Sequence, residues 1–342
     1  MSGLFVPMTK ANGLGNMPDL LEQWAGSRSV ARAYGRAGLP MEVIQFPETW
    51  IPVDAIRSLF EISARAAGDR CFGLHVGKDM THKTFGLWMK YSVQAATLRD
   101  GLIRANQSSR FQQTGGKVVF VPGAQVSFWR YVAPPMQTSS QVQHCDHLIW
   151  PTIRFIQSYL GPLWLPEWVD VSYPRDADAR LLEAQVPFPV RFGTPYLSMA
   201  IRNRDLSPRT PRPFGDGQRI TFDAVRASEA AGPSNETLGT VFNTITLRLL
   251  EGQTDIDGAA CQLGIGVQKL QRDLRREGVD YRDLLNRAKR VRAQELLSDT
   301  DMTVIDIALS LGYSDHGNFS RAFRKMTGVA PSGFRARKDQ MQ

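Results

Sequence analysis

The sequence that decides the fold of this chain is TVIDIALSLGYSDHGNFSRAFRKMTGVAPSGFR, residues 303–335. It predicts a short helix, a tight turn and a second helix. The apolar face of the first helix follows the spacing i, i+3, i+4, i+7 at Val304, Ile307, Ala308 and Leu311. Thr303 fits the N-cap, with the acidic Asp306 three residues later, and Gly312 ends the helix.

The second helix is predicted to start after a cap at Asp315 and to end at Gly328 and Pro331. Its apolar face has the same spacing, at Phe319, Ala322, Phe323 and Met326. The opposite face is polar and basic, with His316, Gly317, Ser320, Arg321 and Arg324, and with Asn318 at its edge. Two helices at a fixed angle, the second with such a face, suit the major groove of DNA. On periodicity alone, the competing interpretation is a helical hairpin with a solvated basic face.

The residues of this stretch resemble the signature of the AraC/XylS family of transcription regulators. About a dozen positions match in order and without gaps, namely Ile307-Ala308, Gly312-Tyr313, Phe319-Ser320-Arg321, Phe323-Arg324, Gly328, Pro331 and Phe334-Arg335. Gly317 departs from the pattern, because a side chain is expected there. Glycine at a helix position costs about 0.5–1 kcal/mol relative to alanine. The resemblance implies a DNA-binding domain with two helix-turn-helix units.

The first of these units is expected upstream, at residues 256–277, IDGAACQLGIGVQKLQRDLRRE. The apolar face of its first helix consists of Ile256, Ala259, Ala260 and Leu263, with Gly264 at the turn. Its second helix has Val267, Leu270 and Leu274 on one face and closes at Gly278. The other face presents side chains that can bond base edges or phosphates, namely Gln268, Lys269, Gln271, Arg272 and Arg275.

One amphipathic helix over about residues 281–298 is predicted to join the two units, with apolar positions Tyr281, Leu284, Leu285, Ala288, Val291 and Leu296. At 1.5 Å per residue it would be ~27 Å long, close to the ~34 Å between successive major-groove faces of B-DNA. The family resemblance places against the bases Gln268, Gln271, Arg272, His316, Asn318 and Arg321. Lys269 is expected to contact the DNA beside them.

Composition narrows the alternatives. The 342 residues leave room for two domains, and the apolar content of 42% suffices for a core in each. The net charge is +8, yet residues 238–342 hold 16 Lys and Arg against 13 Asp and Glu, a net of only +3, so DNA binding must come from local faces. The three cysteines show no paired spacing, and no secretory or membrane-spanning stretch is present. We therefore expect a cytoplasmic protein without a membrane partner.

Residues 202–236 are rich in Arg, Pro, Gly and Ser, which favours a domain boundary. Before it, the pattern predicts a domain that mixes helix and strand. A helix is expected over residues 52–67, and a hairpin over residues 117–132 that turns at Pro122-Gly123. A helical stripe follows within residues 143–161, at Ile149, Ile153, Ile156 and Leu160. The fold class is therefore α+β, with a mixed N-terminal domain and an all-α C-terminal domain.

The N-terminal domain resembles the sensor domain of a subset of AraC-type regulators, often labelled an arabinose-binding-like region. The resemblance covers roughly residues 30–210 and is carried by Asp69-Arg70-Cys71-Phe72-Gly73-Leu74-His75-Val76-Gly77, Phe85-Gly86-Leu87, Thr97-Leu98 and Pro189-Val190-Arg191-Phe192-Gly193. It implies an unidentified small-molecule effector and often dimerisation, but it assigns no effector-binding residue. We expect an effector-sensing and dimerisation domain at residues 1–215, a linker at 216–237 and a DNA-binding domain at 238–342, with helix-turn-helix units at 256–277 and 303–326.

Other clusters favour structural roles. His144-Cys145-Asp146-His147 has metal-ligand residue types, but no second His/Cys pair lies at a familiar spacing, so a polar helix turn is favoured and neither metal nor cofactor is expected. Aromatic side chains that could stack on a ligand, although core positions are favoured, are Trp88, Trp129, Trp150, Trp164 and Trp168. Arg130 is expected to be exposed on its strand, and Cys71 and Cys261 to be buried.

We expect no enzyme. No phosphate-binding loop, nucleophile elbow or catalytic carboxylate pair is present, and no cysteine lies in the Pro-Cys-His-Arg context of an alkylation-repair methyltransferase. The leading hypothesis is a homodimeric, ligand-responsive activator of a metabolic or catabolic operon, which binds double-stranded promoter DNA and contacts RNA polymerase. The alternative is a DNA-binding regulator without a small-molecule effector, whose N-terminal domain serves only for dimerisation.

Overall fold

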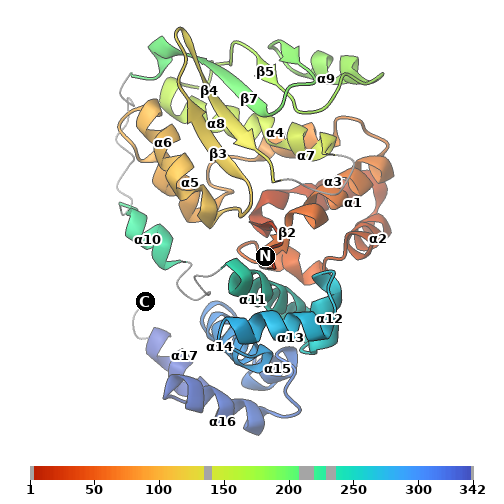
Figure 1. Cartoon of the computed structure of the whole chain (residues 1–342), viewed down its shortest axis with the longest axis vertical. Helices are drawn as coiled ribbons and strands as arrows, with labels where there is room; N and C mark the ends of the chain where they lie inside the picture. The colour runs from red at the N-terminus through yellow and green to blue at the C-terminus, as the bar shows by residue number, and fades with distance from the viewer. Residues whose placement is uncertain (1–3, 135–140, 208–218, 229–235, 340–342) are drawn as a thin grey trace. The chain divides into compact units, whose positions relative to one another are not determined.

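The structure is a computed structural model that describes residues 4–134, 141–207, 219–228 and 236–339. The chain forms two compact units (Figure 1). Pro7–Glu229 makes up the N-terminal unit, and Ala230–Gln342 together with Met1–Val6 makes up the C-terminal unit. Residues 216–218 and 229–235 of the expected linker lie outside the described residues. Between them, α10 (Phe222–Ala227) belongs to the N-terminal unit, where Phe222 packs against the rings of Tyr91 and Phe111.

The strands of the N-terminal unit form two sheets in the part of the chain that the structure describes. The larger sheet has the strand order β3-β4-β7-β5-β6 and is antiparallel except for the β5–β6 pair, while β1 and β2 pair separately. The bounds are β1 Met8–Lys10, β2 Trp50–Pro52, β3 Lys117–Val121, β4 Val126–Val132, β5 Val169–Asp170, β6 Val190–Arg191 and β7 Leu197–Arg202. The predicted hairpin is confirmed, with Phe120 opposite Trp129 and Val118 opposite Tyr131.

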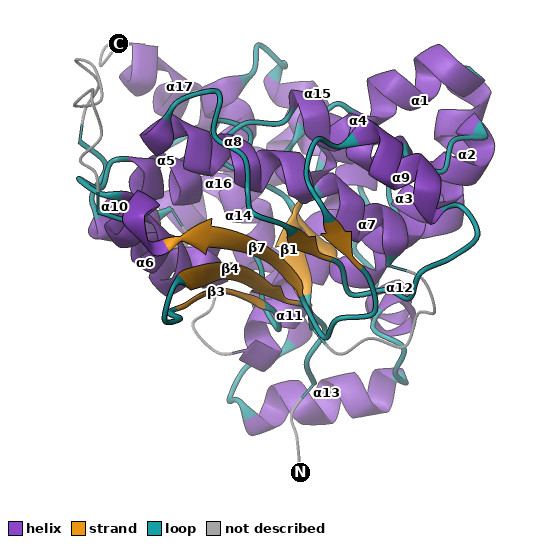
Figure 2. Ribbon diagram, turned by 90° about the horizontal axis from the view of Figure 1, so that it is seen from above, coloured by secondary structure: helices purple, strands orange, loops and turns teal. Residues whose placement is uncertain are grey.

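Helices of this unit gather on one side of the larger sheet, as α5 and α8 show in Figure 2. Accordingly, Ser127, Trp129 and Tyr131 of β4 are buried and alternate with half-buried residues. The helix bounds are α1 Met17–Ala25, α2 Ser27–Ala37, α3 Val53–Ala67, α4 Phe72–Asp79, α5 Gly86–Val93, α6 Leu98–Ser108, α7 Val142–His147, α8 Ile149–Leu160 and α9 Ala179–Gln185.

The helix predicted over residues 52–67 is confirmed as α3. The predicted stripe within 143–161 lies on α8, but the segment is two helices that separate at Leu148. A physical reason for the break is Pro151, which has no N–H to donate to the carbonyl of His147 four residues earlier. The prediction for Arg130 is corrected: the residue is half-buried, donates to Ser198 and stacks on Tyr196.

The glycines of the Gly73–Gly77 motif have a packing role. They lie four residues apart on one face of α4, the face that meets α7. A Cβ atom at Gly73 would collide with the backbone carbonyl of Gln143, and one at Gly77 would collide with that of His147. The absence of side chains at these two positions therefore lets the backbones of the two helices approach closely.

All elements of the described C-terminal unit are helical. They comprise α11 Glu236–Arg248, α12 Ile256–Gln262, α13 Val267–Arg276, α14 Tyr281–Asp299, α15 Val304–Ser310, α16 His316–Thr327 and α17 Pro331–Asp339. The predicted joining helix is confirmed as α14, whose 19 residues span about 28 Å. A capping box of Asp280 and Asp283 closes its N-terminus. The sequence pattern missed α17, which begins at Pro331, a residue that suits the first position of a helix.

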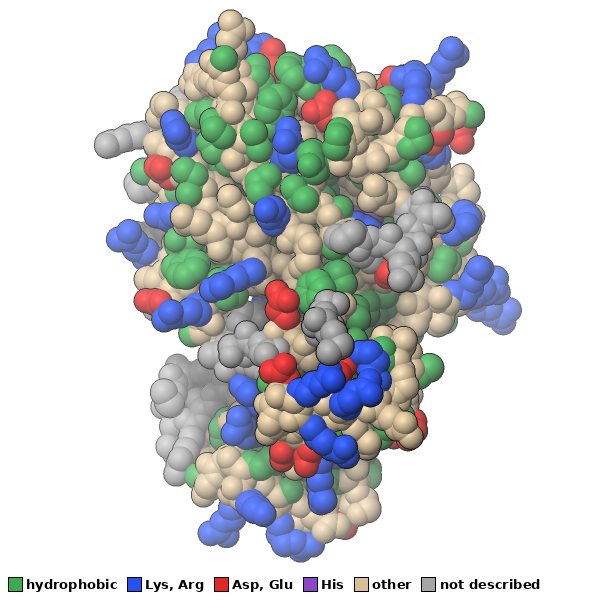
Figure 3. Space-filling view, viewed as in Figure 1, with side chains coloured by type: hydrophobic (Ala, Val, Ile, Leu, Met, Phe, Trp, Pro, Cys, Tyr) green, Lys and Arg blue, Asp and Glu red, His purple; other side chains and the backbone are tan. Residues whose placement is uncertain are grey.

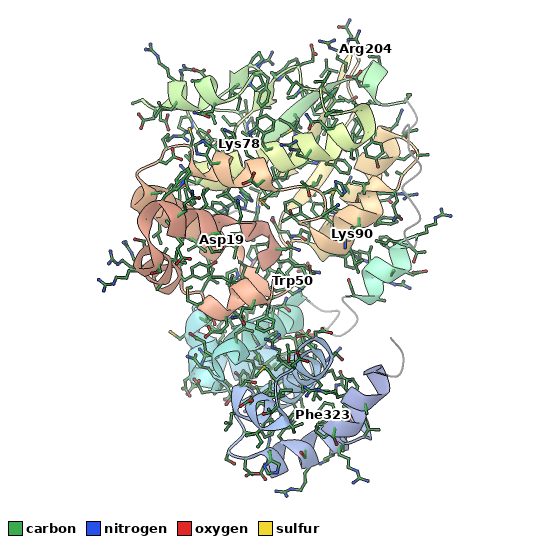
Figure 4. All side chains as sticks on the ribbon, turned by 180° about the vertical axis from the view of Figure 1, so that it is seen from behind. Asp19, Trp50, Lys78, Lys90, Arg204 and Phe323 are labelled. Atoms are coloured by element: carbon green, nitrogen blue, oxygen red, sulfur yellow. The ribbon has the colours of Figure 1, made fainter. Side chains whose placement is uncertain are left out.

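Helix α14 packs against both helix-turn-helix units. Its Leu284 and Ala288 share a core with Leu270 and Leu274 of α13, and Leu4 from the start of the chain joins this core. Farther along, α14 packs against α15, α16 and α17. The second unit is centred on α16, whose Phe319 and Phe323 are fully buried; Figure 4 labels Phe323. The edge-to-face partners of these rings are Tyr313 and Phe334.

The expected burial of Cys261 is wrong, because this residue is exposed on α12. Ala259 and Ala260 fill the buried face of that helix, and the next position turns a further 100° away from it. Cys71 is buried, as predicted. Among the described residues, no helix has both the length and the apolarity to cross a membrane.

Candidate DNA-binding interface and internal cavity

The two helix-turn-helix units are built by the same local chemistry. Asp255 caps α12 by accepting a hydrogen bond from the Gly258 amide at 2.6 Å, and Thr303 caps α15 by accepting one from the Asp306 amide at 3.1 Å. The turn that follows contains a glycine with a left-handed φ, 67° at Gly264 and 70° at Gly312. The second helix of each unit, α13 or α16, begins within four residues of this glycine.

Helix α13 buries its apolar side and leaves a polar, basic side open. Leu270 and Leu274 are buried, whereas Gln268, Lys269 and Arg272 are exposed. Gln271 is half-buried at the edge of this face. Figure 3 shows Lys and Arg side chains gathered over α13 and, separately, over α16. The structure thus places the four side chains expected to contact DNA from this unit together on one helix.

An acidic residue on α13 modifies this charged face. Asp273 is largely buried and accepts ion pairs from Lys269 at 2.7 Å and Arg276 at 3.4 Å. The hydrogen bond from Lys269 is the main reason why the pKa of Asp273 lies below its usual value. Lys269 therefore carries a partly compensated charge. The i, i+4 spacing of Lys269 and Asp273 was the sequence signal that could have found this pair.

Helix α16 presents the second set of predicted residues. His316, Asn318 and Arg321 are all exposed. Asp315 caps the helix by accepting from the Asn318 amide at 2.7 Å. The Arg321 Nη2 donates to Asn318 Oδ1 at 2.6 Å, so a chain of hydrogen bonds from the cap orients the guanidinium group on the open face.

Gly317, the departure from the family pattern, lies between these side chains. A Cβ atom there would lie 3.2 Å from Asp315 Oδ1 and 3.7 Å from Arg321 Nη1. The first distance is tight, and the atom is the cap oxygen that the Asn318 amide holds, whereas the second is an ordinary van der Waals contact. A side chain at this position therefore requires a small shift of the Asp315 cap.

The N-terminal unit contains an internal cavity of about 70 Å³. Its apolar wall includes Phe85, Trp88, Met89, Trp129 and Phe155. Trp88 and Trp129 are buried, as the core interpretation predicted, but both also border this cavity. A single water needs only roughly 10–15 Å³ of such space and a cavity of about 150 Å³ holds benzene, so this cavity has room for several waters or for a ligand smaller than benzene.

The polar part of the wall is mostly uncharged. Gln112, Gln113 and Tyr131 line it, and Gln113 Nε2 donates to the Tyr131 hydroxyl at 2.7 Å. His144 and His147 complete the wall. Burial holds the pKa of His144 well below its usual value and lowers the pKa of His147 to about 4, so both rings are neutral near pH 7. Neutral polar groups on an apolar wall are typical of small-molecule sites.

The His144-Cys145-Asp146-His147 segment is a buried helical turn, and its side chains have separate partners. His147 stacks on Phe60 with ring centroids 4.5 Å apart. Asp146 accepts from Arg70 at 2.8 Å and from the Tyr173 hydroxyl at 2.5 Å. Among the described residues, no group of three or more His, Cys, Asp or Glu is arranged to hold a metal ion.

Two helix-turn-helix units on a shared helical core define a DNA-binding protein with two candidate recognition helices per chain. Comparison with known proteins extends this assignment. Residues 28–209 match the family model described as the arabinose-binding domain of AraC transcription regulator, N-term, and residues 259–337 match a helix-turn-helix domain. The chain belongs to the AraC family of transcription regulators.

Two curated relatives match part of the chain at more than 30% identity. The ornithine utilization regulator of Pseudomonas aeruginosa is 38% identical over 81 residues, which are 24% of each chain. The HTH-type transcriptional regulator VirS of Mycobacterium tuberculosis is 34% identical over 148 residues, which are 43% of each chain. The chain thus matches less than half the length of these two relatives. The crystal structure of the transcriptional regulator CdpR from Pseudomonas aeruginosa is 18% identical, with a TM-score of 0.40, over 90% of this chain and 97% of that one.

Proposed function

We propose that this regulator is ligand-responsive and activates a metabolic or catabolic operon. The observation that carries the proposal is the internal cavity of the N-terminal unit, with its aromatic wall and its neutral polar groups. Apart from Thr9 and Gly13, the lining residues of this cavity lie within the region that matches the arabinose-binding family model. A small molecule bound there stabilises the conformations of the unit that enclose it, and only such differential binding can shift the activity of a regulator.

The proposal assigns DNA contacts to the open faces of α13 and α16. Gln268, Gln271 and Arg272 approach base edges from the first unit. His316, Asn318 and Arg321 do so from the second unit, and Lys269 contacts a phosphate. Arginine and glutamine or asparagine suit these roles, because they bond guanine and adenine, respectively, through two hydrogen bonds. The pairing of Lys269 with Asp273 favours a phosphate contact over base recognition, because an ammonium group acts as a point charge.

The remaining parts of the proposal concern organisation. Residues 1–215 sense the effector and form the homodimer, residues 216–237 link the domains, and residues 238–342 bind promoter DNA. The protein acts in the cytoplasm, is not an enzyme and activates transcription by contact with RNA polymerase. These roles rest on membership of the family.

A two-stage experiment on the full-length chain tests the proposal. Duplexes selected from a random DNA library identify the binding site, and fluorescence anisotropy gives the affinity for it. A thermal-shift screen against amines, amino acids, sugars and carboxylic acids then seeks a ligand, which stabilises by RT ln(1 + [L]/Kd). A compound that raises the melting temperature with dose and changes DNA affinity or promoter activity supports the proposal. A broad, silent screen with normal DNA binding supports the effector-free alternative.

A further inference from the structure

Arg57 on α3 is a buried cation that forms no ion pair with a side chain in the described part of the chain. Its residue is 3% exposed, and its Nε and Nη2 atoms find no hydrogen-bond acceptor among the described residues. Arg70, in the same unit, pairs with Asp146 at 2.8 Å and Asp176 at 3.2 Å. Arginine stays protonated in proteins, and a buried charge is normally paired. The environment of Arg57 therefore calls for an anion that the described side chains do not supply.

Arg57 lies next to the cavity, so the anion that it needs could be a ligand bound there. The preceding residue, Ile56, lines the cavity. The guanidinium group interacts with the Tyr131 hydroxyl. Its charge also lowers the pKa of His144, although burial and the neighbouring His147 lower that pKa more. Both of those rings line the cavity, so Arg57 adjoins it at the wall that they form.

The charges around the cavity also bear on the charge that its ligand carries. Among the described lining residues there is no Asp or Glu, and the charged one is Lys117. Both lining histidines are neutral near pH 7, so the positive charges at this wall belong to Lys117 and the adjoining Arg57, while the buried Asp146 next to His147 is already paired with Arg70. A cationic ligand would find no counter-charge among the described lining residues. Gln112 Oε1, also in the wall, has no hydrogen-bond donor among the described residues, so it is an acceptor for an N–H or O–H group and not a second partner for a carboxylate.

We infer that the effector is a compact carboxylate with an apolar body, whose carboxylate accepts hydrogen bonds from Arg57 where this residue adjoins the cavity, beside Tyr131. The apolar body then packs against Trp88, Trp129 and Phe155 in the cavity. The inference rests on the proposed role of the cavity as the effector site. Two observations indicate an anionic ligand. Arg57 has guanidinium atoms without a described hydrogen-bond partner, and the described cavity wall contains no Asp or Glu.

Titration calorimetry of the full-length chain tests the ligand class. The probes are acetate and propanoate, with their amides as neutral isosteres and ethylamine as the cation. We expect the acids to bind at least about tenfold more tightly than the other probes, because charge-assisted hydrogen bonds to Arg57 are lost with a neutral group. Tighter binding of an amide or of the amine would overturn the inference while leaving an effector site in place.

Variants then test the anchor. Arg57→Met keeps an unbranched side chain but removes the charge, and it should weaken carboxylate binding at least about tenfold without lowering the melting temperature, because an unpaired buried charge is removed. Tyr131→Phe keeps the ring and should weaken binding several-fold. Arg65→Met is the matched control, since Arg65 is exposed on the same helix. Unchanged carboxylate affinity in Arg57→Met refutes the inference. If neither these probes nor a broad metabolite screen binds, the proposed effector site itself fails.

Discussion

Arg321→Ala is the sharpest test of the DNA-binding face. Arg321 is exposed on α16, and its guanidinium group is oriented by Asn318, whose amide in turn binds the cap residue Asp315. Removal of the side chain leaves the cap bond between Asp315 and the Asn318 amide intact. The free energy of unfolding should therefore change by no more than about 0.5 kcal/mol, as is usual for exposed positions.

The expected effect on DNA affinity follows from the lost contact. A bidentate arginine–guanine contact contributes about 1–3 kcal/mol of discrimination, so affinity for the selected site should fall about 5- to 150-fold. Non-specific binding should fall far less, because it loses one cation and the slope of log K against log salt changes by only about 0.9. Base preference at the contacted position should relax.

The assay is fluorescence anisotropy with the selected duplex and a scrambled duplex over a range of salt concentrations. Arg272→Ala tests the corresponding position of α13 and should behave in the same way. Arg282→Ala is the matched control. It removes the same charge, but Arg282 is exposed on α14, outside both recognition helices. If Arg321→Ala and Arg272→Ala both bind the selected site as tightly as the wild type does, the assignment of α13 and α16 as recognition helices is wrong.

Further predictions concern charge, packing and pH. Lys269→Ala should weaken binding to all duplexes about equally and flatten the salt dependence; loss of affinity for the selected site alone would contradict a phosphate contact. Gly77→Ala should destabilise the N-terminal unit by about 1–3 kcal/mol, because the added methyl group collides with the His147 carbonyl, whereas Gly35→Ala on α2, where no atom lies within 4 Å, should not. Because burial lowers the pKa of His147 to about 4, its neutral form is favoured by folding. The resulting stability, on the order of 3 kcal/mol, is complete above the unfolded pKa of about 6.5 and is lost as pH falls toward 4. His147→Gln should flatten this part of the melting-temperature profile, and an unaltered profile would show that His147 titrates normally.

Local patterns predicted the C-terminal unit well. The apolar spacing in residues 303–335, the caps at Thr303 and Asp315 and the turn at Gly312 all occur as expected. The reason is physical: a cap or an amphipathic face involves residues no more than a few positions apart, so the sequence displays the interaction directly. The exposed faces of α13 and α16 could be predicted for the same reason, because the free face of a helix is the complement of its apolar face; the DNA contacts assigned to them remain predictions.

Local sequence patterns could not predict the interactions between segments that are distant along the chain. The cavity brings together residues from Thr9 to Phe155, and neither its presence nor its wall can be inferred from local spacing. The close contact of α4 with α7 explains Gly73 and Gly77 only once both helices are in place. The buried charge of Arg57 and the exposure of Cys261 likewise depend on which neighbours cover each helix. The sequence alone thus determined the helices that carry the predicted DNA-contacting side chains, while burial and cavity shape were decided by tertiary packing, because they depend on atoms that are far apart along the chain.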